Sequence, residues 1–102
     1  MKIMRIQPPA GLPAEADFSW QEKTVQGARC GRADGARIVR SPRRFKLFCE
    51  GRDELLFLDG NGHFKWARGE TPFAAGQAFC IEGEGEYEVN GPCTFIAVQK
   101  QM

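Results

Sequence analysis

The sequence predicts a small all-β domain, an antiparallel β-barrel or jelly roll. About seven short strand-like runs are separated by turn signals at intervals of about 8 to 12 residues, a spacing typical of antiparallel sandwiches and barrels. No segment sustains the periodicity of an amphipathic helix. The length of 102 residues corresponds to a single domain. With 42% hydrophobic and 26% charged residues, the composition indicates a globular protein rather than a disordered one.

Residues 1–30 form an irregular N-terminal segment with one short strand. The run Lys2–Ile6 alternates as a strand does, and the prolines at positions 8, 9 and 13 then force an extended or turning path. Around Phe18 and Trp20 the pattern leaves open whether a helical turn or a short strand forms.

Residues 31–102 carry the regular pattern of the expected barrel. The expected strands cover residues 36–40, 43–50, 54–58, 63–67, 77–81, 85–90 and 93–99. Turns are expected at residues 51–53 and 90–92. A tight hairpin is expected at Asp59–Gly62, because the Asp-Gly and Asn-Gly pairs supply the positive φ values of such turns.

Charge and cysteine usage narrow the classes of function. The net charge of +1 provides no field that would attract nucleic acid or a membrane. The four cysteines form no CxxC pair and lie mostly in apolar runs, which predicts buried, reduced thiols. The N-terminus lacks the apolar region of a signal peptide, and no apolar run approaches the roughly 20 residues of a membrane span. We therefore expect a cytoplasmic protein without a nucleic-acid or membrane partner.

The stretch Gly76–Tyr87 resembles the second sequence motif of the cupin superfamily. That motif runs from a glycine through five residues, Pro-x-Gly and two further residues to a metal-binding histidine. Gly76 matches the first glycine, Glu82 and Glu84 stand at the positions of the proline and the second glycine, and Tyr87 stands at the position of the histidine.

Two further stretches extend this resemblance. Residues 48–51 resemble the strand that closes the first cupin motif, and residues 87–91 are similar to the C-terminal barrel of type I mannose-6-phosphate isomerases. The resemblance covers residues 36–100 and implies a cupin-like barrel.

The positions of the cupin metal ligands hold residues that do not bind divalent metals. Counted back from Gly51, the glutamate position falls on Arg44, and the two histidine positions fall on Ile38 and Arg40, or on Arg37 and Val39. The single histidine, His63, stands apart beside the expected hairpin. Since transition-metal sites need about three or four clustered ligands, we expect neither a metal nor another cofactor. The zinc-dependent isomerase activity of the resembled proteins is not expected.

Five residues are candidates for a ligand-binding site: Arg40, Arg44, Trp66, Phe79 and Tyr87. The arginines could bind an anion, because a planar guanidinium pairs with carboxylate or phosphate through two hydrogen bonds. Strand parity favours a solvated face instead, since the apolar residues around Arg44 occupy the opposite side of the strand. The three aromatic residues would line an apolar pocket in an unfilled barrel, or form the core of a filled one.

A ladder of acidic residues alternates with apolar ones near the C-terminus. Its members are Glu82, Glu84, Glu86 and Glu88. The alternation places all four on one outward face, which predicts a solvent-facing edge that discourages strand aggregation. Pairing with the basic residues of positions 29–52, within one chain or across a dimer, is a second interpretation.

Together these features predict a metal-free, cupin-like domain that is not an enzyme and that binds a small sugar-like or anionic molecule, or a partner. A homodimer is expected from the resemblance, with the strand Lys2–Ile6 crossing to the second copy. Two alternatives stay open. One is a metal-independent enzyme that acts on sugars or small polar substrates through Tyr87 together with an arginine or one of the glutamates, and the other is a homo-oligomeric interaction module.

Overall fold

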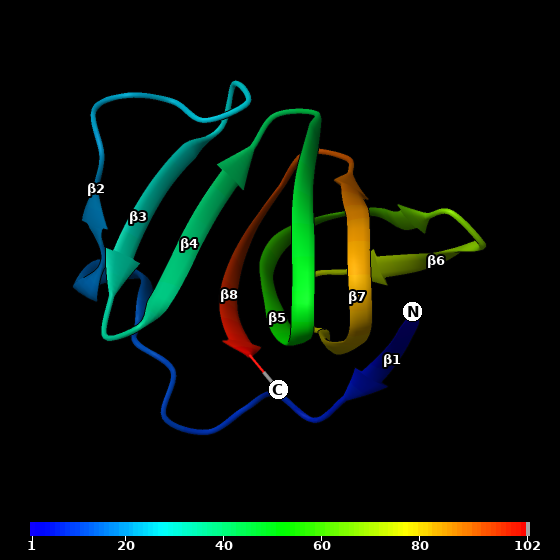
Figure 1. The fold of residues 1–102 in the computed structure, drawn as a ribbon. Helices are drawn as coiled ribbons and strands as arrows, with labels where there is room; N and C mark the ends of the chain where they lie inside the picture. The colour runs from blue at the N-terminus through cyan, green and yellow to red at the C-terminus, as the bar shows by residue number, and fades with distance from the viewer. Residues whose placement is uncertain (102) are drawn as a thin grey trace.

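The structure is a computed structural model that describes residues 1–101 of the chain. It consists almost entirely of strands (Figure 1). The elements are β1 (Lys2–Ile6), η1 (Glu15–Asp17), β2 (Ser19–Trp20), β3 (Arg29–Ala33), β4 (Ala36–Ser41), β5 (Arg44–Trp66), β6 (Gly69–Ala74), β7 (Ala78–Asn90) and β8 (Cys93–Gln101). The all-β prediction is confirmed. Around Phe18 and Trp20, both a short helical turn (η1) and a short strand (β2) form.

All the strands pair antiparallel in one strongly curved sheet. Its order is β1-β7-β5-β8-β4-β3-β2, with β6 paired to the second half of β5. The long strand β5 holds the barrel together, because its first half pairs with β7 and β8 and its second half returns to β7. β7 therefore lies between two portions of β5, which gives the small antiparallel barrel expected from the sequence.

The hairpin expected at Asp59–Gly62 is wrong. The chain continues through these residues as part of the 23-residue strand β5, and the register shifts there against both β7 and β8. Gly60 adopts a φ of +85°, and a Cβ atom on it would collide with the Pro92 carbonyl oxygen. A Cβ on Gly62 would collide with the carbonyl oxygen of Asn90. Gly60 and Gly62 thus allow a sharp bend in the strand and a close approach of neighbouring backbone, and they do not form a two-residue turn.

Aromatic rings fill the barrel interior around the bend of β5. Phe57 stacks on Phe73 with ring centroids 3.9 Å apart, and the edges of Phe64 and Phe79 contact the Phe57 ring at 5.6 and 6.1 Å. All four side chains are buried. This half of the barrel is packed with side chains, so the predicted aromatic residues there form core.

The N-terminal segment covers part of the outer face of the sheet. Phe18 is buried against Ile38 of β4 and Ile96 of β8, a second apolar cluster separate from the barrel interior. At the edge of this cluster the guanidinium groups of Arg29 and Arg40 lie 5.1 and 4.8 Å from the centroid of Trp20. The irregular segment therefore packs onto the barrel as part of its structure.

The first strand, β1, lies at one end of the sheet order. It pairs with β7 in the register Ile3↔Ile81, and within residues 1–101 no second strand pairs with it. Dimerisation through this strand stays a prediction. No helix among the described residues is long and apolar enough to cross a membrane.

Candidate functional site

The structure does not bring the five predicted site residues together. Arg40 is exposed on the outer face, where it forms an ion pair of 2.7 Å with Glu15. Arg44 is exposed at the start of β5, as strand parity favours. Tyr87 is 1% exposed and points into the barrel interior, so both arginines lie on the other side of the sheet from it.

The three predicted aromatic residues lie closer to one another. Trp66 of β5 is paired in register with Tyr87 of β7, and Trp66 is half-buried against the barrel cluster. Phe79 is core, with its ring 5.0 Å from that of Phe64. Phe64 in turn lies 6.3 Å from the ring of Tyr87. These aromatic side chains pack around Tyr87 and hold its ring in place in the core.

The hydroxyl of Tyr87 is hydrogen-bonded to the buried carboxylate of Asp53, a residue that the sequence analysis did not identify as a site residue. It donates a hydrogen bond of 2.6 Å to Oδ2 of Asp53, whose side chain is fully buried. Gln99 Nε2 donates to the same oxygen at 3.0 Å and to the carbonyl oxygen of Phe48 at 3.2 Å. Asp53 and Gln99 are paired in register on β5 and β8, which sets the two side chains on the same face.

Residues 51–53 were expected to form a turn, and for that reason Asp53 was not identified as a buried residue. In the structure they continue β5, so the inward parity of Leu47 and Cys49 runs on to Asp53, Leu55 and Phe57. A fully buried carboxylate in an otherwise apolar row is costly and therefore notable. If residues 51–53 are read as strand rather than as a turn, the alternation of the sequence places Asp53 on the buried face.

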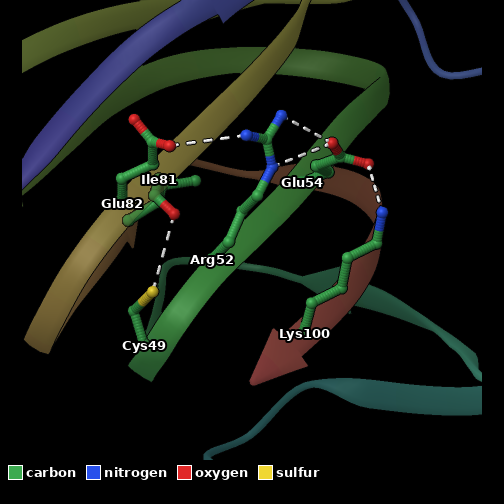
Figure 2. A network of polar contacts seen from close by, with 6 residues as sticks. All are labelled: Cys49, Arg52, Glu54, Ile81, Glu82 and Lys100. Carbon is green, nitrogen blue, oxygen red and sulfur yellow. Dashed lines mark hydrogen bonds and ion pairs between the residues drawn. The ribbon is translucent and has the colours of Figure 1, made fainter. Parts of the chain in front are cut away.

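Burial, reinforced by the nearby carboxylate of Asp53, raises the pKa values of Tyr87 and Cys49 and favours their neutral forms. Burial, reinforced by the charge and hydrogen bonding of Asp53, raises the pKa of Tyr87 well above its usual range, and the positive charge of Arg37 opposes this weakly. Burial, with a smaller effect of the Asp53 charge, also raises the pKa of the Cys49 thiol. That thiol lies 3.6 Å from the carbonyl oxygen of Ile81 (Figure 2).

Two buried polar atoms at this end of the barrel lack a hydrogen-bond partner within the described residues. One is Oδ1 of Asp53, and the other is Nε of Arg37. The guanidinium of Arg37 lies 5.3 Å from the ring centroid of Phe45. Because an unpaired buried polar atom is costly, each of these atoms needs an explanation.

Asp53 forms the buried part of the wall of a surface pocket of about 310 Å³. The other lining residues are Phe48, Glu50, Gln99 and Lys100, all of them exposed. Phe48 is the most exposed large hydrophobic residue among those described, at 52%. The pocket thus lies against a buried carboxylate, one oxygen of which has no hydrogen-bond partner among the described residues.

An ion-pair network braces the strands beside this pocket (Figure 2). Arg52 donates to Glu54 at 3.0 and 3.2 Å and to Glu82 of β7 at 3.4 Å. The Nζ of Lys100 lies 3.6 Å from the other oxygen of Glu54. The network joins β5, β7 and β8, and it fixes the side chain of Lys100 at the pocket wall.

The acidic ladder of β7 faces outward, and the edge expected from the sequence is present in part. One side of β7 pairs with the first half of β5 along its length. On the other side β1 pairs as far as Glu82 and the second half of β5 pairs from Tyr87, so residues 83–86 have no second neighbouring strand within the described chain. Glu88 is paired in register with Lys46 on one side and Lys65 on the other, and Glu82 with Arg52. The second interpretation, pairing of the ladder with basic residues of the same chain, agrees with this register.

The side chains at the cupin histidine position do not fit a divalent metal. Tyr87 uses its proton in the hydrogen bond to Asp53, and its raised pKa keeps it a neutral phenol. Arg37 adds a positive charge at the same end. Among the described residues, no three His, Cys, Asp or Glu side chains gather closely enough to hold a metal ion. The donor set is suited to hydrogen bonding rather than to coordination.

Comparison with known proteins gives a cupin-like fold. Mannose 6-phosphate isomerase from Bacillus subtilis matches with a TM-score of 0.61 at 14% identity, over 86% of this chain and 30% of the isomerase. The cupin domain of Drosophila melanogaster CENP-C has a TM-score of 0.57 at 10% identity, over 94% of this chain and 85% of that domain. KdgF from a Halomonas species has a TM-score of 0.56 at 13% identity, over 86% and 94% of the two chains.

These identities establish a likeness of fold alone. The chain spans less than a third of the length of the isomerase. No protein-family model matches the chain, and no curated protein matches it in sequence. The cupin-like barrel implied by residues 36–100 is confirmed, and the function has to be argued from the site.

Proposed function

We propose that this protein is a non-enzymatic binding domain that holds a small polar molecule in the pocket beside Asp53. One observation carries the proposal: Oδ2 of the buried carboxylate accepts two hydrogen bonds, whereas Oδ1 has no partner within the described part of the chain. An unsatisfied buried acceptor costs about 1–3 kcal/mol, and more when it is charged. A ligand that donates a hydrogen bond to Oδ1 would recover this free energy.

The pocket suits a small molecule that donates hydrogen bonds. Its volume of about 310 Å³ lies at the lower end of the range for small-molecule sites. The carboxylates of Asp53 and Glu50 line it, which disfavours the anionic ligand considered from the sequence. A sugar hydroxyl or an amine has the required donor.

Binding rather than catalysis is favoured by the protonation states of the neighbouring groups. The raised pKa of Tyr87 keeps its hydroxyl protonated at neutral pH, so it cannot act there as a general base. The raised pKa of Cys49 likewise keeps its thiol from forming the nucleophilic thiolate. The Tyr87 hydroxyl donates to the carboxylate instead, and the Cys49 thiol donates to the Ile81 carbonyl oxygen.

Thermal unfolding in the presence of small molecules tests this proposal. We expect at least one compound from a panel of sugars, amines, phosphates and carboxylates to raise the unfolding midpoint of the wild-type chain, since a ligand of the native state stabilises it. Asp53→Asn, which retains an acceptor for Tyr87 but removes the charge, should abolish that shift.

The matched control is Glu84→Gln, which removes an exposed carboxylate that does not line this pocket. It should leave the ligand-induced shift unchanged. The proposal fails if no class of compound moves the midpoint, or if the shift persists in Asp53→Asn.

A further inference from the structure

We propose that the edge of β5 at residues 44–48 binds an extended, acidic peptide of a partner protein as an added strand. β7 pairs with one side of these residues along their whole length. On the other side β8 pairs with β5 only from Gly51 onward, so within residues 1–101 no strand pairs with residues 44–48 there. An antiparallel peptide at this edge would lie in line with the end of β8. The site is separate from the pocket beside Asp53, although Phe48 and Gln99 adjoin both.

Side-chain amides bond to the backbone of this edge in the place of a strand. Nε2 of Gln26 donates to the carbonyl oxygen of Lys46 at 2.9 Å, and the N–H of Lys46 donates to Oε1 of Gln26 at 2.8 Å. The amide of Gln99 donates to the carbonyl oxygen of Phe48 at 3.2 Å. These backbone groups therefore point away from β7, in the direction that an antiparallel neighbour uses. A peptide strand that replaces the amides would make the main-chain hydrogen bonds of strand addition.

The segment that carries Gln26 is weakly held against β5. Residues 21–27 are all exposed, and among the described residues the two bonds of the Gln26 amide are the hydrogen bonds that join this segment to β5. Gln26 also adopts a φ of +55°, a conformation that is unfavourable for a residue other than glycine. The net value of an exposed hydrogen bond is small because water can replace it. An incoming strand can therefore displace the Gln26 amide from Lys46.

The side chain of Phe48 gives the edge an apolar contact. It is 52% exposed, the most exposed large hydrophobic residue among those described. The alternation of the strand places it on the outer face with Arg44 and Lys46, whereas Phe45 and Leu47 are buried in the barrel. An apolar side chain directly opposite Phe48 would cover the ring and form a stabilising cross-strand pair.

The charges of the edge favour an acidic peptide. Arg44 and Lys46 are exposed, and neither forms an ion pair among the described residues. On the β7 side, Arg44 is in register with the uncharged Asn90 and Lys46 with Glu88. A carboxylate on the added strand would lie about 5 Å from the Lys46 position and two strand spacings, about 10 Å, from that of Glu88. Attraction to the nearer charge exceeds the repulsion. The antiparallel peptide then has an apolar residue opposite Phe48 and acidic residues two and four positions later.

A short peptide of this pattern tests the proposal. We expect acetyl-Thr-Phe-Thr-Glu-Thr-Glu-Thr-amide, titrated into the 15N-labelled wild-type chain, to shift the backbone amides of residues 44–48 and the side-chain amide of Gln26 in NMR spectra. The same peptide with lysines in place of the two glutamates should bind about tenfold or more weakly. N-methylation of the first glutamate removes the donor to the Lys46 carbonyl oxygen and should weaken binding several-fold.

Three variants of the chain separate the contributions of backbone and charge. Gln26→Ala keeps the positive φ but removes the competing amide, so the glutamate peptide should bind several-fold more tightly. Lys46→Glu should weaken the glutamate peptide and strengthen the lysine peptide. The matched control is Lys65→Glu, because Lys65 is also exposed and in register with Glu88 but lies on the second half of β5. It should leave both affinities unchanged.

Several outcomes would overturn the proposal. They are no shift at residues 44–48 with millimolar glutamate peptide, equal or tighter binding of the lysine peptide, and no gain of affinity in Gln26→Ala. A dimer in analytical ultracentrifugation that Phe48→Asp converts to a monomer would make a second copy the occupant and would also overturn it. None of these results depends on small-molecule binding beside Asp53, which is measured separately.

Discussion

Asp53 is the residue on which the chemistry of this barrel depends. Its carboxylate is fully buried, and among residues 1–100 Oδ2 accepts hydrogen bonds from Tyr87 and Gln99 while Oδ1 accepts none. Removing one donor from a buried charge costs more than the net value of an average hydrogen bond, because the charge keeps its desolvation penalty. The Tyr87 hydroxyl therefore stabilises the fold and also holds Oδ2 of Asp53 in a hydrogen bond, which leaves Oδ1 as the oxygen that a ligand could use.

Tyr87→Phe should lower the free energy of unfolding at pH 7 by about 1.5–3 kcal/mol, the range for hydrogen bonds to charged groups. It should also change the pH dependence. The pKa of Tyr87 is raised in the folded chain, so the unfolded chain loses this proton first, near pH 10. The stability that this group provides is present below about pH 10 and falls as the pH rises further.

Urea unfolding of wild type and Tyr87→Phe between pH 7 and 11 measures both effects. The buried cysteines are present in both proteins, so the difference between the curves reports Tyr87 together with its electrostatic coupling to Cys49. That difference should shrink at alkaline pH. Curves that stay parallel to pH 11 would contradict the assignment of the raised pKa to this hydroxyl.

The sequence contained part of this residue-scale information. It placed Tyr87 at the position of a metal-binding histidine and favoured the solvated face for Arg44, and the structure has Tyr87 buried and Arg44 exposed. Asp53 was missed because Gly51 and Asp53 are common turn residues, and local propensity cannot reveal that the strand continues. Pairing with β7 and β8 overrides that propensity.

At the scale of elements, the bend of β5 decides the architecture. A strand of 23 residues can pair with β7 on both sides only if it turns sharply, and the register shifts between Leu56 and His63 show where it does so. Asp-Gly and Asn-Gly pairs signal positive φ, which a hairpin and a bulged corner both use. The sequence therefore indicated the place of the bend but not its type.

Gly60→Ala should destabilise the chain by about 3 kcal/mol or more, because it adds a steric collision with the Pro92 carbonyl to the strain of a positive φ. Gly76→Ala is the matched control. Gly76 has a φ of +86°, close to the +85° of Gly60, but a Cβ on it meets nothing within 4 Å. Gly76→Ala should lower the free energy of unfolding by about 1–3 kcal/mol, the range for backbone strain alone.

Urea unfolding of both variants gives the comparison. Equal losses would mean that the approach of Pro92 to the bend contributes nothing, and the proposed role of Gly60 as a contact point between β5 and the turn before β8 would be wrong.

At the scale of the whole molecule, a barrel with one continuous buried core carries a polar surface pocket beside Asp53. Aromatic residues around Phe57 fill the interior near the bend, while Asp53 and Gln99 lie toward the opposite end of the β5–β8 pair. The N-terminal segment adds a second apolar cluster through Phe18 on the outer face. Fold class and strand pattern were predictable from periodicity. The placement of the pocket beside Asp53 was not, because it depends on long-range strand pairing that periodicity does not contain.

The most direct test of the pocket is to map where small molecules bind. Titration of the 15N-labelled chain with the panel of sugars, amines, phosphates and carboxylates should shift the backbone amide of Asp53 and the side-chain amide of Gln99, and leave the region of Trp66 and Glu86 unchanged. We predict such localised shifts for at least one compound. Shifts confined to the Trp66 region, or no shifts with any compound of the panel, would contradict a binding site at Asp53.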